Sequence, residues 1–447
     1  MVYWTIIFIF VVNYTKTQEM DKEIIKRLII EKQEEIASTR LVKRPIKLES
    51  TANYVFVGLR RAGKSYLMYQ HIQDLVCSKQ ISIKEVLYIN FEDERIASIK
   101  AEELGLLLDA YKEMFDAKPF IFLDEIQNIY GWEKFARRLS DAKYRVFITG
   151  SNAQMLSKDI YTTLGGRYVA YEVFPFSFCE YLQYHGIVLN KNWEYTNTET
   201  KVFKLFHSYF YYGGFAEIFA MTDKRGWLNS LYQKILLGDI ISRNEIRNEN
   251  AIRVLVKKLA ESVMQPSSLS RIKNIVDSTG TTISRNTLTD YLHYLTDACL
   301  VFGISNYSDK LSDKETIKKR YFFDNGLLNN FLIDPETKLI ENLVAIDLKK
   351  KYGDGLFFYH KNVEVDFFIP NEHRAIQVSY SMANHATRQR EVSALLKLSD
   401  VYRIDRLEII TFNQASSWIE NGKKIEVIPI WKWLLINTKN TPPPPPK

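Results

Sequence analysis

Short apolar runs alternate with stretches in which apolar residues recur at helical spacing along the first third of this chain. Apolar runs occupy residues 53–57, 86–90, 120–123 and 144–149. This alternation predicts an α/β fold with a doubly wound parallel sheet, because a parallel connection needs a crossover that a helix commonly provides. The carboxyl ends of parallel strands meet at one edge of the sheet, so the residues after these runs are expected to share a site.

The middle of the chain changes to mainly helical spacing. Residues 193–247 are rich in Tyr and Phe, and we expect helices that form a lid on the sheet, with the aromatic side chains in its core. Apolar residues recur at helical spacing over 269–276 and again after Ser284, a predicted N-cap, and strand-like runs follow at 300–305 and 320–323. This order predicts a winged helix.

The last part of the chain returns to a mixed pattern. A helix is expected to begin at Glu341, and strand-like runs follow at residues 356–359, 363–369 and 375–378. This order predicts a second α/β unit.

Both ends of the chain differ from the rest. Residues 2–12 are apolar apart from Thr5, but this run is shorter than the roughly 20 residues of a spanning helix, and it lacks the flanks of a signal peptide. We expect a start-site artefact, with translation beginning at Met20 and Asp21 opening an amphipathic helix. The alternative is a short anchor with weak membrane association and no stable insertion. Residues 442–446 are all proline, which predicts a disordered tail.

The composition is that of an ordinary globular protein. Of 447 residues, 46% are hydrophobic and 25% are charged, with a net charge of +7. A mainly disordered chain is therefore excluded, and the charge alone does not indicate a nucleic-acid partner. The three cysteines, Cys77, Cys179 and Cys299, form no CxxC pair. This argues against a disulfide framework or a zinc site and favours a reducing, cytoplasmic location.

One motif carries specific chemistry. Residues 58–65 read GLRRAGKS between a strand-like run and a helical stretch, which is a complete phosphate-binding loop, or Walker A motif. The glycines let backbone N–H groups point inward, and the following helix directs its positive end to the same place. Lys64 is expected to contact the β- and γ-phosphates of ATP, and Ser65 to bind Mg²⁺. The predicted nucleotide-binding residues of this loop are Gly58, Leu59, Arg60, Arg61, Ala62, Gly63, Lys64, Ser65 and Tyr66.

A second motif supports the first. Residues 120–125 form an apolar run that ends in Asp124 and Glu125, which is a Walker B pattern. Asp124 is expected to hold the Mg²⁺ shell and Glu125 to polarise the attacking water. Ser151 and Asn152 follow the next strand and are candidate sensors of the γ-phosphate, and they also suit an ordinary helix N-cap. Together these residues predict an ATP hydrolase that uses ATP and Mg²⁺.

Five further motifs point to a family. They are TGSN at residues 149–152, LGGR at 164–167, GGFAE at 213–217, YFFD at 321–324 and VEVD at 363–366. With the two Walker motifs, the first half of the chain resembles the AAA-type ATPases of the AAA+ superfamily. The later motifs resemble those of a prokaryotic group of ATP-binding proteins that carry a winged-helix segment and a C-terminal domain of unknown function similar to restriction endonucleases.

The resemblance implies a domain organisation. The expected units are an apolar extension, an AAA-type P-loop core, a helical lid, a winged helix, a nuclease-like α/β domain and a tail, at residues 1–19, 20–185, 186–250, 251–335, 336–432 and 433–447. In the family pattern, the arginine after the paired glycines reaches the γ-phosphate in the same or a neighbouring subunit and acts in catalysis. That residue is Arg167 here, and an arginine at a surface turn is the alternative interpretation.

The nuclease-like domain departs from the pattern of an active enzyme. Glu341 and Asp366 match two metal-binding acids, but Gln377 and Ser379 stand where an acid and a lysine are expected. No lysine then remains to support the attacking water. We expect a vestigial site at Glu341, Asp366 and Gln377, in a domain used for binding or packing, and an active nuclease is the disfavoured alternative.

Two kinds of function remain open. The leading expectation is an ATPase that acts as a nucleotide-driven switch or remodeller on a protein partner or on further copies of itself. The alternative is a DNA-binding regulator or defence component that turns its nucleotide over slowly, because a winged helix can dock in the major groove of duplex DNA. The candidate phosphate contacts of its wing, which also suit a solvated hairpin, are Lys310, Lys314, Lys318 and Lys319.

Overall fold

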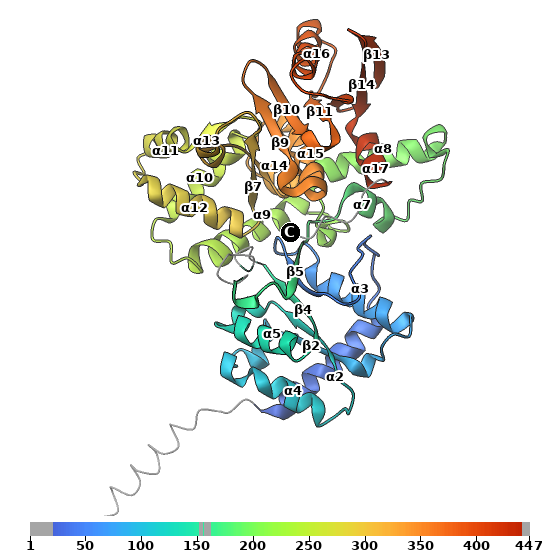
Figure 1. The fold of residues 1–447 in the computed structure, drawn as a ribbon, viewed down its shortest axis with the longest axis vertical. Helices are drawn as coiled ribbons and strands as arrows, with labels where there is room; N and C mark the ends of the chain where they lie inside the picture. Colours follow the sequence, from blue (N-terminus) through green and yellow to red (C-terminus); the bar gives the residue numbers. More distant parts are fainter. Residues whose placement is uncertain (1–20, 152–154, 156–161, 440–447) are drawn as a thin grey trace, which may run out of the picture.

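The chain folds into a lower and an upper part that meet near the middle of the molecule (Figure 1). This computed structural model describes residues 21–151, 155 and 162–439. The lower part contains one sheet, and the upper part contains a second sheet with helices around it. The apolar extension at residues 1–19 and the proline run at residues 442–446 lie outside the described residues.

The lower part is a parallel sheet of five strands in the order β2-β3-β4-β1-β5. Every neighbouring pair is parallel, which confirms the parallel sheet expected from the alternating pattern. The first four strands coincide with the four apolar runs, and β5 adds a fifth at the edge. The strands are β1 Asn53–Val57, β2 Val86–Asn90, β3 Phe120–Asp124, β4 Arg145–Gly150 and β5 Tyr168–Glu172.

Both faces of this sheet are covered, which explains why its strands are apolar throughout. Val55 and Leu87 belong to the core on one face, beneath α2, α4 and α5, whereas Phe56 and Phe122 face the other side, beneath α3. The main helices are α2 Lys22–Ser38, α3 Lys64–Cys77, α4 Gly105–Lys112 and α5 Trp132–Asp141, and short 3-10 helices occupy Ile83–Glu85, Glu94–Ile96, Ala101–Leu104 and Ile126–Asn128.

Helix α2 begins as the sequence predicts. Asp21 is its N-cap, and the carboxylate accepts a hydrogen bond of 2.9 Å from the backbone N–H of Glu23. Such a cap satisfies one of the free N–H groups of the first turn. The apolar side of the helix then packs against the sheet through Ile25 and Ile29.

Helices rich in aromatic residues connect the two parts. Phe206 and Phe210 are fully buried and belong to a core that continues from the α3 face of the lower sheet into the upper part. Apart from the exposed Tyr195, the aromatic side chains of residues 193–247 lie in or against this core, as expected. These helices are α7 Phe178–Tyr184, α8 Asn197–Tyr212, α9 Lys224–Lys234 and the π-helix η8 Ile235–Ser242, with 3-10 turns at Trp193–Tyr195 and Ala216–Ile218.

The middle segment contains the expected helices and hairpin. Ser284 caps its helix by accepting a hydrogen bond of 3.0 Å from the N–H of Thr287. The polar stretch between the hairpin strands holds a short helix that the sequence did not indicate. In chain order the elements are α10 Glu249–Glu261, β6 Ser267–Ser268, α11 Leu269–Ser278, α12 Arg285–Asp297, β7 Val301–Asn306, α13 Leu311–Thr316, β8 Ile317–Phe322 and α14 Asn325–Asn329.

The last segment shares its sheet with the middle segment. Nine strands follow the order β13-β14-β12-β11-β10-β9-β7-β8-β6, and β7 pairs with β9 in parallel, with Ser305 opposite Phe357. The boundary expected at residue 335 therefore does not separate two sheets. The elements are α15 Glu336–Tyr352, β9 Phe357–His360, β10 Glu364–Ile369, β11 Arg374–Val378, α16 His385–Ser399, β12 Arg406–Thr411, β13 Ser416–Glu420, β14 Lys423–Pro429 and α17 Ile430–Lys439, with 3-10 turns at Gly353–Gly355 and Pro370–Glu372.

Two boundaries in this segment differ from expectation. Glu341 lies inside α15, which begins at Glu336, rather than at the start of a helix. Residues 433–439, which were expected to belong to the tail, lie in α17 instead, and Trp433 is buried. None of the helices among the described residues combines the length and the apolar character needed to cross a membrane.

Candidate nucleotide-binding site

The P-loop forms between β1 and α3, where the sequence predicts it. Gly63 precedes α3 with φ of 91°, a left-handed conformation that suits glycine. Lys64 is buried, and its Nζ donates to the carbonyl oxygens of Gly58 at 3.1 Å and Leu59 at 3.3 Å. The ammonium group is therefore held beneath the loop rather than in solvent.

Asp124 ends β3 beside this loop. Tyr88 donates a hydrogen bond of 2.6 Å to its Oδ2, Thr149 donates to its Oδ1, and Ser65 is a further side-chain partner. Burial and the neighbouring charge of Glu125 raise the pKa of Asp124 above its usual value. Ser65 and Asp124, the two predicted Mg²⁺ ligands, thus lie in contact, and this oxygen pair fits a hard divalent cation.

Glu125 follows directly and adopts a left-handed backbone with φ of 52°, which is uncommon for a residue other than glycine. Its N–H donates to Thr149 at 2.9 Å, its Oε2 accepts from Gln127 at 2.6 Å, and its Oε1 lies 3.6 Å from the Nζ of Lys64. Burial alone would raise the pKa of Glu125, but Lys64, Gln127 and Arg60 hold it below its usual value. The side chain is therefore an ionised carboxylate at neutral pH.

The candidate sensor residues are only partly described. Ser151 is buried at the end of β4, and its Oγ accepts a hydrogen bond of 3.3 Å from Gln127. Asn152 lies outside the described residues. Sequence reasoning missed Gln127, whose buried Oε1 has no partner among the described residues. The sequence feature that could have identified Gln127 is its position two residues after Glu125.

A cavity of about 480 Å³ opens above the loop. It brings together Lys64, Ser65, Asp124 and Glu125, as the sequence predicts. Three predicted loop residues do not line it, because Leu59 and Ala62 are buried in the core and Gly58 packs against the backbone of Val173. The further lining residues are Arg40, Leu41, Val42, Arg44, Arg60, Arg61, Gly63, Tyr66, Gln70, Asn90, Glu92, Phe176, Tyr184, Ala216 and Glu217.

Many of these lining residues come from outside the motifs. Arg44 is one example: its Nε donates to Glu180 at 2.7 Å, and its guanidinium lies over the ring of Phe176. No local pattern marks such residues, because the segments are joined only by folding. Leu41, Val42 and Phe176 add apolar side chains to the lining of the cavity, and apolar lining suits an uncharged part of a ligand.

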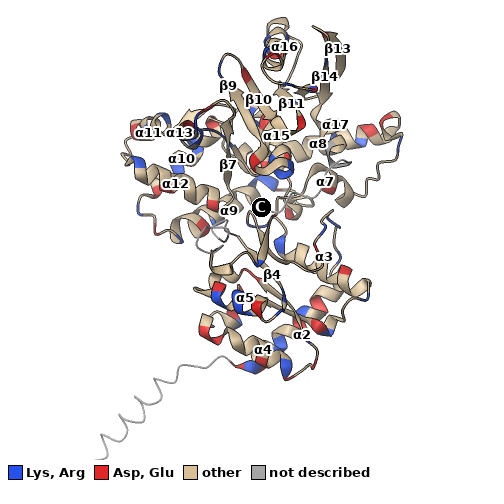
Figure 2. Ribbon diagram, in the orientation of Figure 1, with Lys and Arg blue, Asp and Glu red and all other residues tan. Residues whose placement is uncertain are grey.

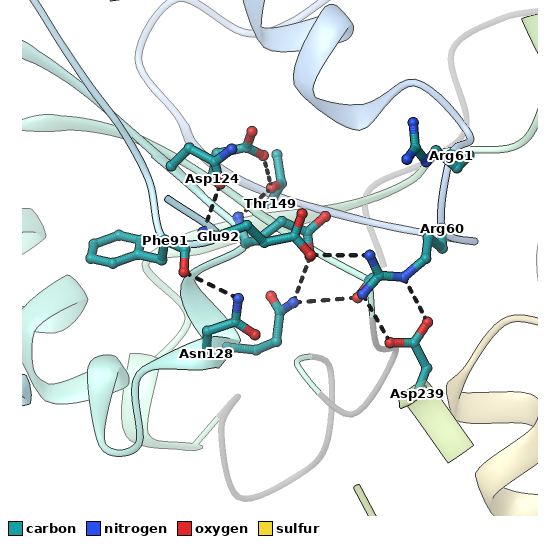
Figure 3. Close-up of polar contacts among 12 residues, drawn as sticks. Arg60, Arg61, Phe91, Glu92, Asp124, Asn128, Thr149 and Asp239 are labelled. Atoms are coloured by element: carbon teal, nitrogen blue, oxygen red, sulfur yellow. Dashed lines mark hydrogen bonds and ion pairs between the residues drawn. The ribbon is translucent and has the colours of Figure 1, made fainter. Parts of the chain in front are cut away.

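The two arginines of the loop point to different partners (Figure 3). Arg60 lies between Glu92 and Asp239, with bonds of 3.0 Å to Glu92 and of 2.9 and 3.1 Å to the two oxygens of Asp239. Arg61 turns away from them and pairs with Glu217 at 2.9 Å. Both arginines therefore connect the P-loop to the helices of the upper part.

Arg167 lies at the opposite edge of the sheet from the P-loop. It immediately precedes β5, whose first residue pairs with Asn53 at the start of β1, whereas the loop leaves the far end of β1 after Val57. Its Nε donates to Asp141 at 2.6 Å. The expectation that Arg167 reaches the γ-phosphate within the same chain is therefore wrong for this arrangement, because a strand of five residues separates the two places.

Comparison with known proteins agrees with this geometry. The AAA domain family matches residues 50–182, and a domain of unknown function (DUF8612) matches residues 203–337. The uncharacterized protein MJ1544 of Methanocaldococcus jannaschii is 33% identical over 439 residues, which cover 93% of this chain and 96% of that protein. The chain belongs to the family of this archaeal protein. It carries an AAA domain of the P-loop ATPase type.

Two more distant similarities add to the comparison. An uncharacterized protein of Haemophilus influenzae is 29% identical over 392 residues, which cover 85% of this chain and 94% of that protein. Among solved structures, the Walker-type ATPase PABY2304 of Pyrococcus abyssi is 14% identical and covers 71% of this chain and 97% of its own, with a TM-score of 0.37.

Outside the AAA domain, a second polar cluster surrounds Lys319. This lysine lies on β8 and is fully buried, with its Nζ 3.0 Å from Asp366, 3.0 Å from Glu364 and 3.5 Å from Glu341. The expectation that no lysine accompanies these acids is wrong, and so is the interpretation of Lys319 as a solvated residue of the wing. The middle segment supplies the lysine, because its hairpin joins the same sheet.

The other two predicted members of this cluster are Glu341 and Gln377. Burial and the charge of Asp366 raise the pKa of Glu341 well above its usual value, although Lys319 opposes this. Gln377 accepts a bond of 2.8 Å from the N–H of Asp366 and donates one of 3.0 Å to the carbonyl of Glu364, so its amide joins β11 to β10. Among the described residues, no group of three or more His, Cys, Asp or Glu side chains is arranged to hold a metal ion.

Two of the family motifs meet at Asp324. This buried carboxylate accepts hydrogen bonds from the N–H groups of Gly214 at 2.8 Å, Gly326 at 2.7 Å and Leu327 at 3.2 Å. A Cβ at Gly213 would lie 2.1 Å from its Oδ1, so glycine is required there. Asp324 therefore fastens the loop after α8 to the end of β8.

The pH dependence of stability tests this contact. Burial raises the pKa of Asp324 from 3.8 to about 6, which corresponds to about 3 kcal/mol. The folded state then binds a proton that the unfolded state releases, so the free energy of unfolding should fall as pH rises from about 4 to about 6. Asp324→Asn should remove about 3 kcal/mol of this fall, measured by urea unfolding across that range. Equal pH profiles for both proteins would contradict the assignment.

Proposed function

We propose that this protein is a Mg²⁺-dependent ATP hydrolase that acts as a nucleotide-driven switch or remodeller. The observation that supports the proposal is the convergence of Lys64, Ser65, Asp124 and Glu125 on one cavity beside the P-loop. A cation, an oxygen pair that suits Mg²⁺ and an ionised carboxylate are the groups that phosphoryl transfer to water requires.

Each residue has a distinct role in this proposal. Lys64 binds the β- and γ-phosphates, and Ser65 and Asp124 hold Mg²⁺, which when bound would neutralise negative charge on the phosphates. Glu125 orients the attacking water and accepts its proton, since its pKa lies below the usual value and the group is ionised. Gln127 and Thr149 hold Glu125 in place by hydrogen bonds.

Arginines that line the cavity form ion pairs with the upper part of the molecule, and this arrangement suits a nucleotide-driven switch. Arg61 pairs with Glu217 in the upper part, and Arg44 pairs with Glu180, which lies 3.7 Å from Lys350 on α15. A change at the nucleotide is therefore passed through ion pairs to the upper part. Such a link suits a protein that acts on a partner through its upper part, either another protein or a second copy of itself.

Lys64→Ala tests the function. The wild-type chain should bind a fluorescent ATP analogue and release phosphate in the presence of Mg²⁺. The variant should lose affinity by about 10-fold or more, because it removes a charge-assisted contact to phosphate, and its phosphate release should fall to background. Wild-type protein that neither binds nor hydrolyses ATP would refute the proposal.

Two additions to this experiment separate the remaining alternatives. If the rate of ATP hydrolysis per protein chain rises with protein concentration, this would support a role for Arg167 in the site of a neighbouring subunit. Turnover that rises steeply with duplex DNA would favour the DNA-binding regulator, in which α11, α12 and the hairpin β7–β8 form a winged helix. Positive and negative residues are mixed along the helices of both parts (Figure 2), and Lys319 is buried, so we favour a protein partner.

For the C-terminal segment, we propose a nuclease-like domain that no longer cuts DNA. The amide of Gln377 is engaged with the backbone of β10, and the ammonium of Lys319 already lies between Asp366 and Glu364. The cluster then serves to join the middle and last segments of the chain.

A further inference from the structure

Arg60 holds an unusual position for a residue of a phosphate-binding loop. It lies two residues after Gly58, lines the same cavity as Lys64 and Asp124, and contributes to the lowered pKa of Glu125. Arg60 thus adds a cation to this cavity in addition to Lys64, in the same chain. This matters because Arg167 lies at the other edge of the sheet.

The side chain of Arg60 is fixed by the upper part of the molecule. Two of its nitrogens donate to the two oxygens of Asp239, whose side chain is only 5% exposed. Figure 3 shows Asp239 approaching Arg60 from a different part of the chain than Glu92, which contacts it from the turn after β2 in the lower part. A guanidinium with two parallel bonds to one carboxylate is held in a defined orientation.

Asp239 itself lies on an irregular element. Its helix, η8, is a π-helix over Ile235–Ser242, and π-helical segments often occur at functional sites. Arg243, one turn later, lies 3.9 Å from the same carboxylate. Arg243 is therefore a second cation beside Asp239. It would stay there if the guanidinium of Arg60 moved to another anion.

On the basis of the proposed function, we infer that Arg60 recognises the terminal phosphate of ATP, and that this phosphate competes with Asp239 for its guanidinium. The competition distinguishes ATP from ADP, which lacks that phosphate. When Arg60 leaves Asp239, the P-loop loses a direct contact with η8. The state of the nucleotide is thereby reported to the upper part by a residue of the loop itself.

Equilibrium binding tests this inference without relying on hydrolysis. A fluorescent ADP bound to the full chain with Mg²⁺ is displaced by ADP or by a non-hydrolysable ATP analogue. Arg60→Gln should lower the affinity for the ATP analogue by about 10- to 100-fold, the effect of losing a charged hydrogen bond, and should change ADP affinity by less than about 3-fold. Arg95→Gln is the matched control, since Arg95 is an exposed arginine that also pairs with two carboxylates, Glu31 and Asp93, and it should change neither.

The variant Asp239→Asn gives a second, independent test of the inference. It weakens the competing partner of Arg60, so the affinity for the ATP analogue should rise several-fold while ADP affinity stays constant. The double variant Arg60→Gln/Asp239→Asn should behave like Arg60→Gln alone, because Asp239 acts through Arg60. The inference is overturned if Arg60→Gln weakens both nucleotides equally or neither, or if Asp239→Asn has no selective effect. Wild-type protein that binds neither nucleotide overturns the proposed function as well.

Discussion

Replacing Glu125 with Gln is expected to lower the rate of ATP hydrolysis by about 10²- to 10⁴-fold, the usual contribution of a general base. The amide keeps the size of the side chain but cannot accept the proton of the attacking water. The measurement is steady-state phosphate release together with the affinity for a fluorescent ATP analogue. The affinity should change by less than about 3-fold, because Lys64 and the loop, rather than Glu125, bind the phosphates.

The backbone around Glu125 should keep its conformation in this variant. The backbone at Glu125 is left-handed and its N–H donates to Thr149, and neither feature depends on the charge of the side chain. Glu426→Gln, which alters an exposed glutamate that pairs with Lys424 on β14, is the control and should leave turnover unchanged. If Glu125→Gln hydrolyses ATP at the wild-type rate, Glu125 does not activate the water.

Replacing Lys319 with Met should lower the free energy of unfolding by about 3–5 kcal/mol, the cost of leaving a buried charge without its partner. Methionine has nearly the length of lysine but no charge, so Asp366 and Glu341 would face each other without a cation. Thermal or urea unfolding measures the loss.

Two further variants check the cause of this loss. Asp366→Asn in the Lys319→Met background should restore part of the stability, because it removes one of the unpaired charges. Lys424→Met removes a lysine from an exposed ion pair with Glu426 and should cost less than about 1 kcal/mol. A loss of that small size for Lys319→Met would mean that the cluster does not depend on the ammonium group.

The local elements of the AAA domain could be read from the sequence because neighbouring residues determine them. Apolar runs specify β1 to β4, and the glycines of the P-loop specify the turn into α3. Elsewhere in the chain, capping residues mark helix starts, as Asp21 and Ser284 do by accepting bonds from N–H groups two or three residues later. Lys64, Asp124 and Glu125 were found for the same reason, since each follows directly from a strand or loop pattern.

Residues that depend on long-range pairing could not be read in this way. The local sequence places Lys319 on a hairpin, as a phosphate contact of the wing or as a solvated residue, because nothing there indicates that β7 pairs with β9. Gln377 appeared to be a vestigial ligand, and only the pairing of β10 with β11 gives its amide two backbone partners. Arg167 appeared to belong to the ATP site, and only the register of β5 against β1 places it at the other edge.

The sequence by itself determined that this chain has a phosphate-binding loop, a strand that ends in two acids and a parallel sheet that brings them together. Short-range sterics and hydrogen bonds are sufficient for those features. Only the tertiary structure decided which distant charges meet there and at the acid cluster, such as Arg60 with Asp239 and Lys319 with Asp366. Such contacts arise from the packing of whole elements, and the sequence around each residue carries no record of the partner.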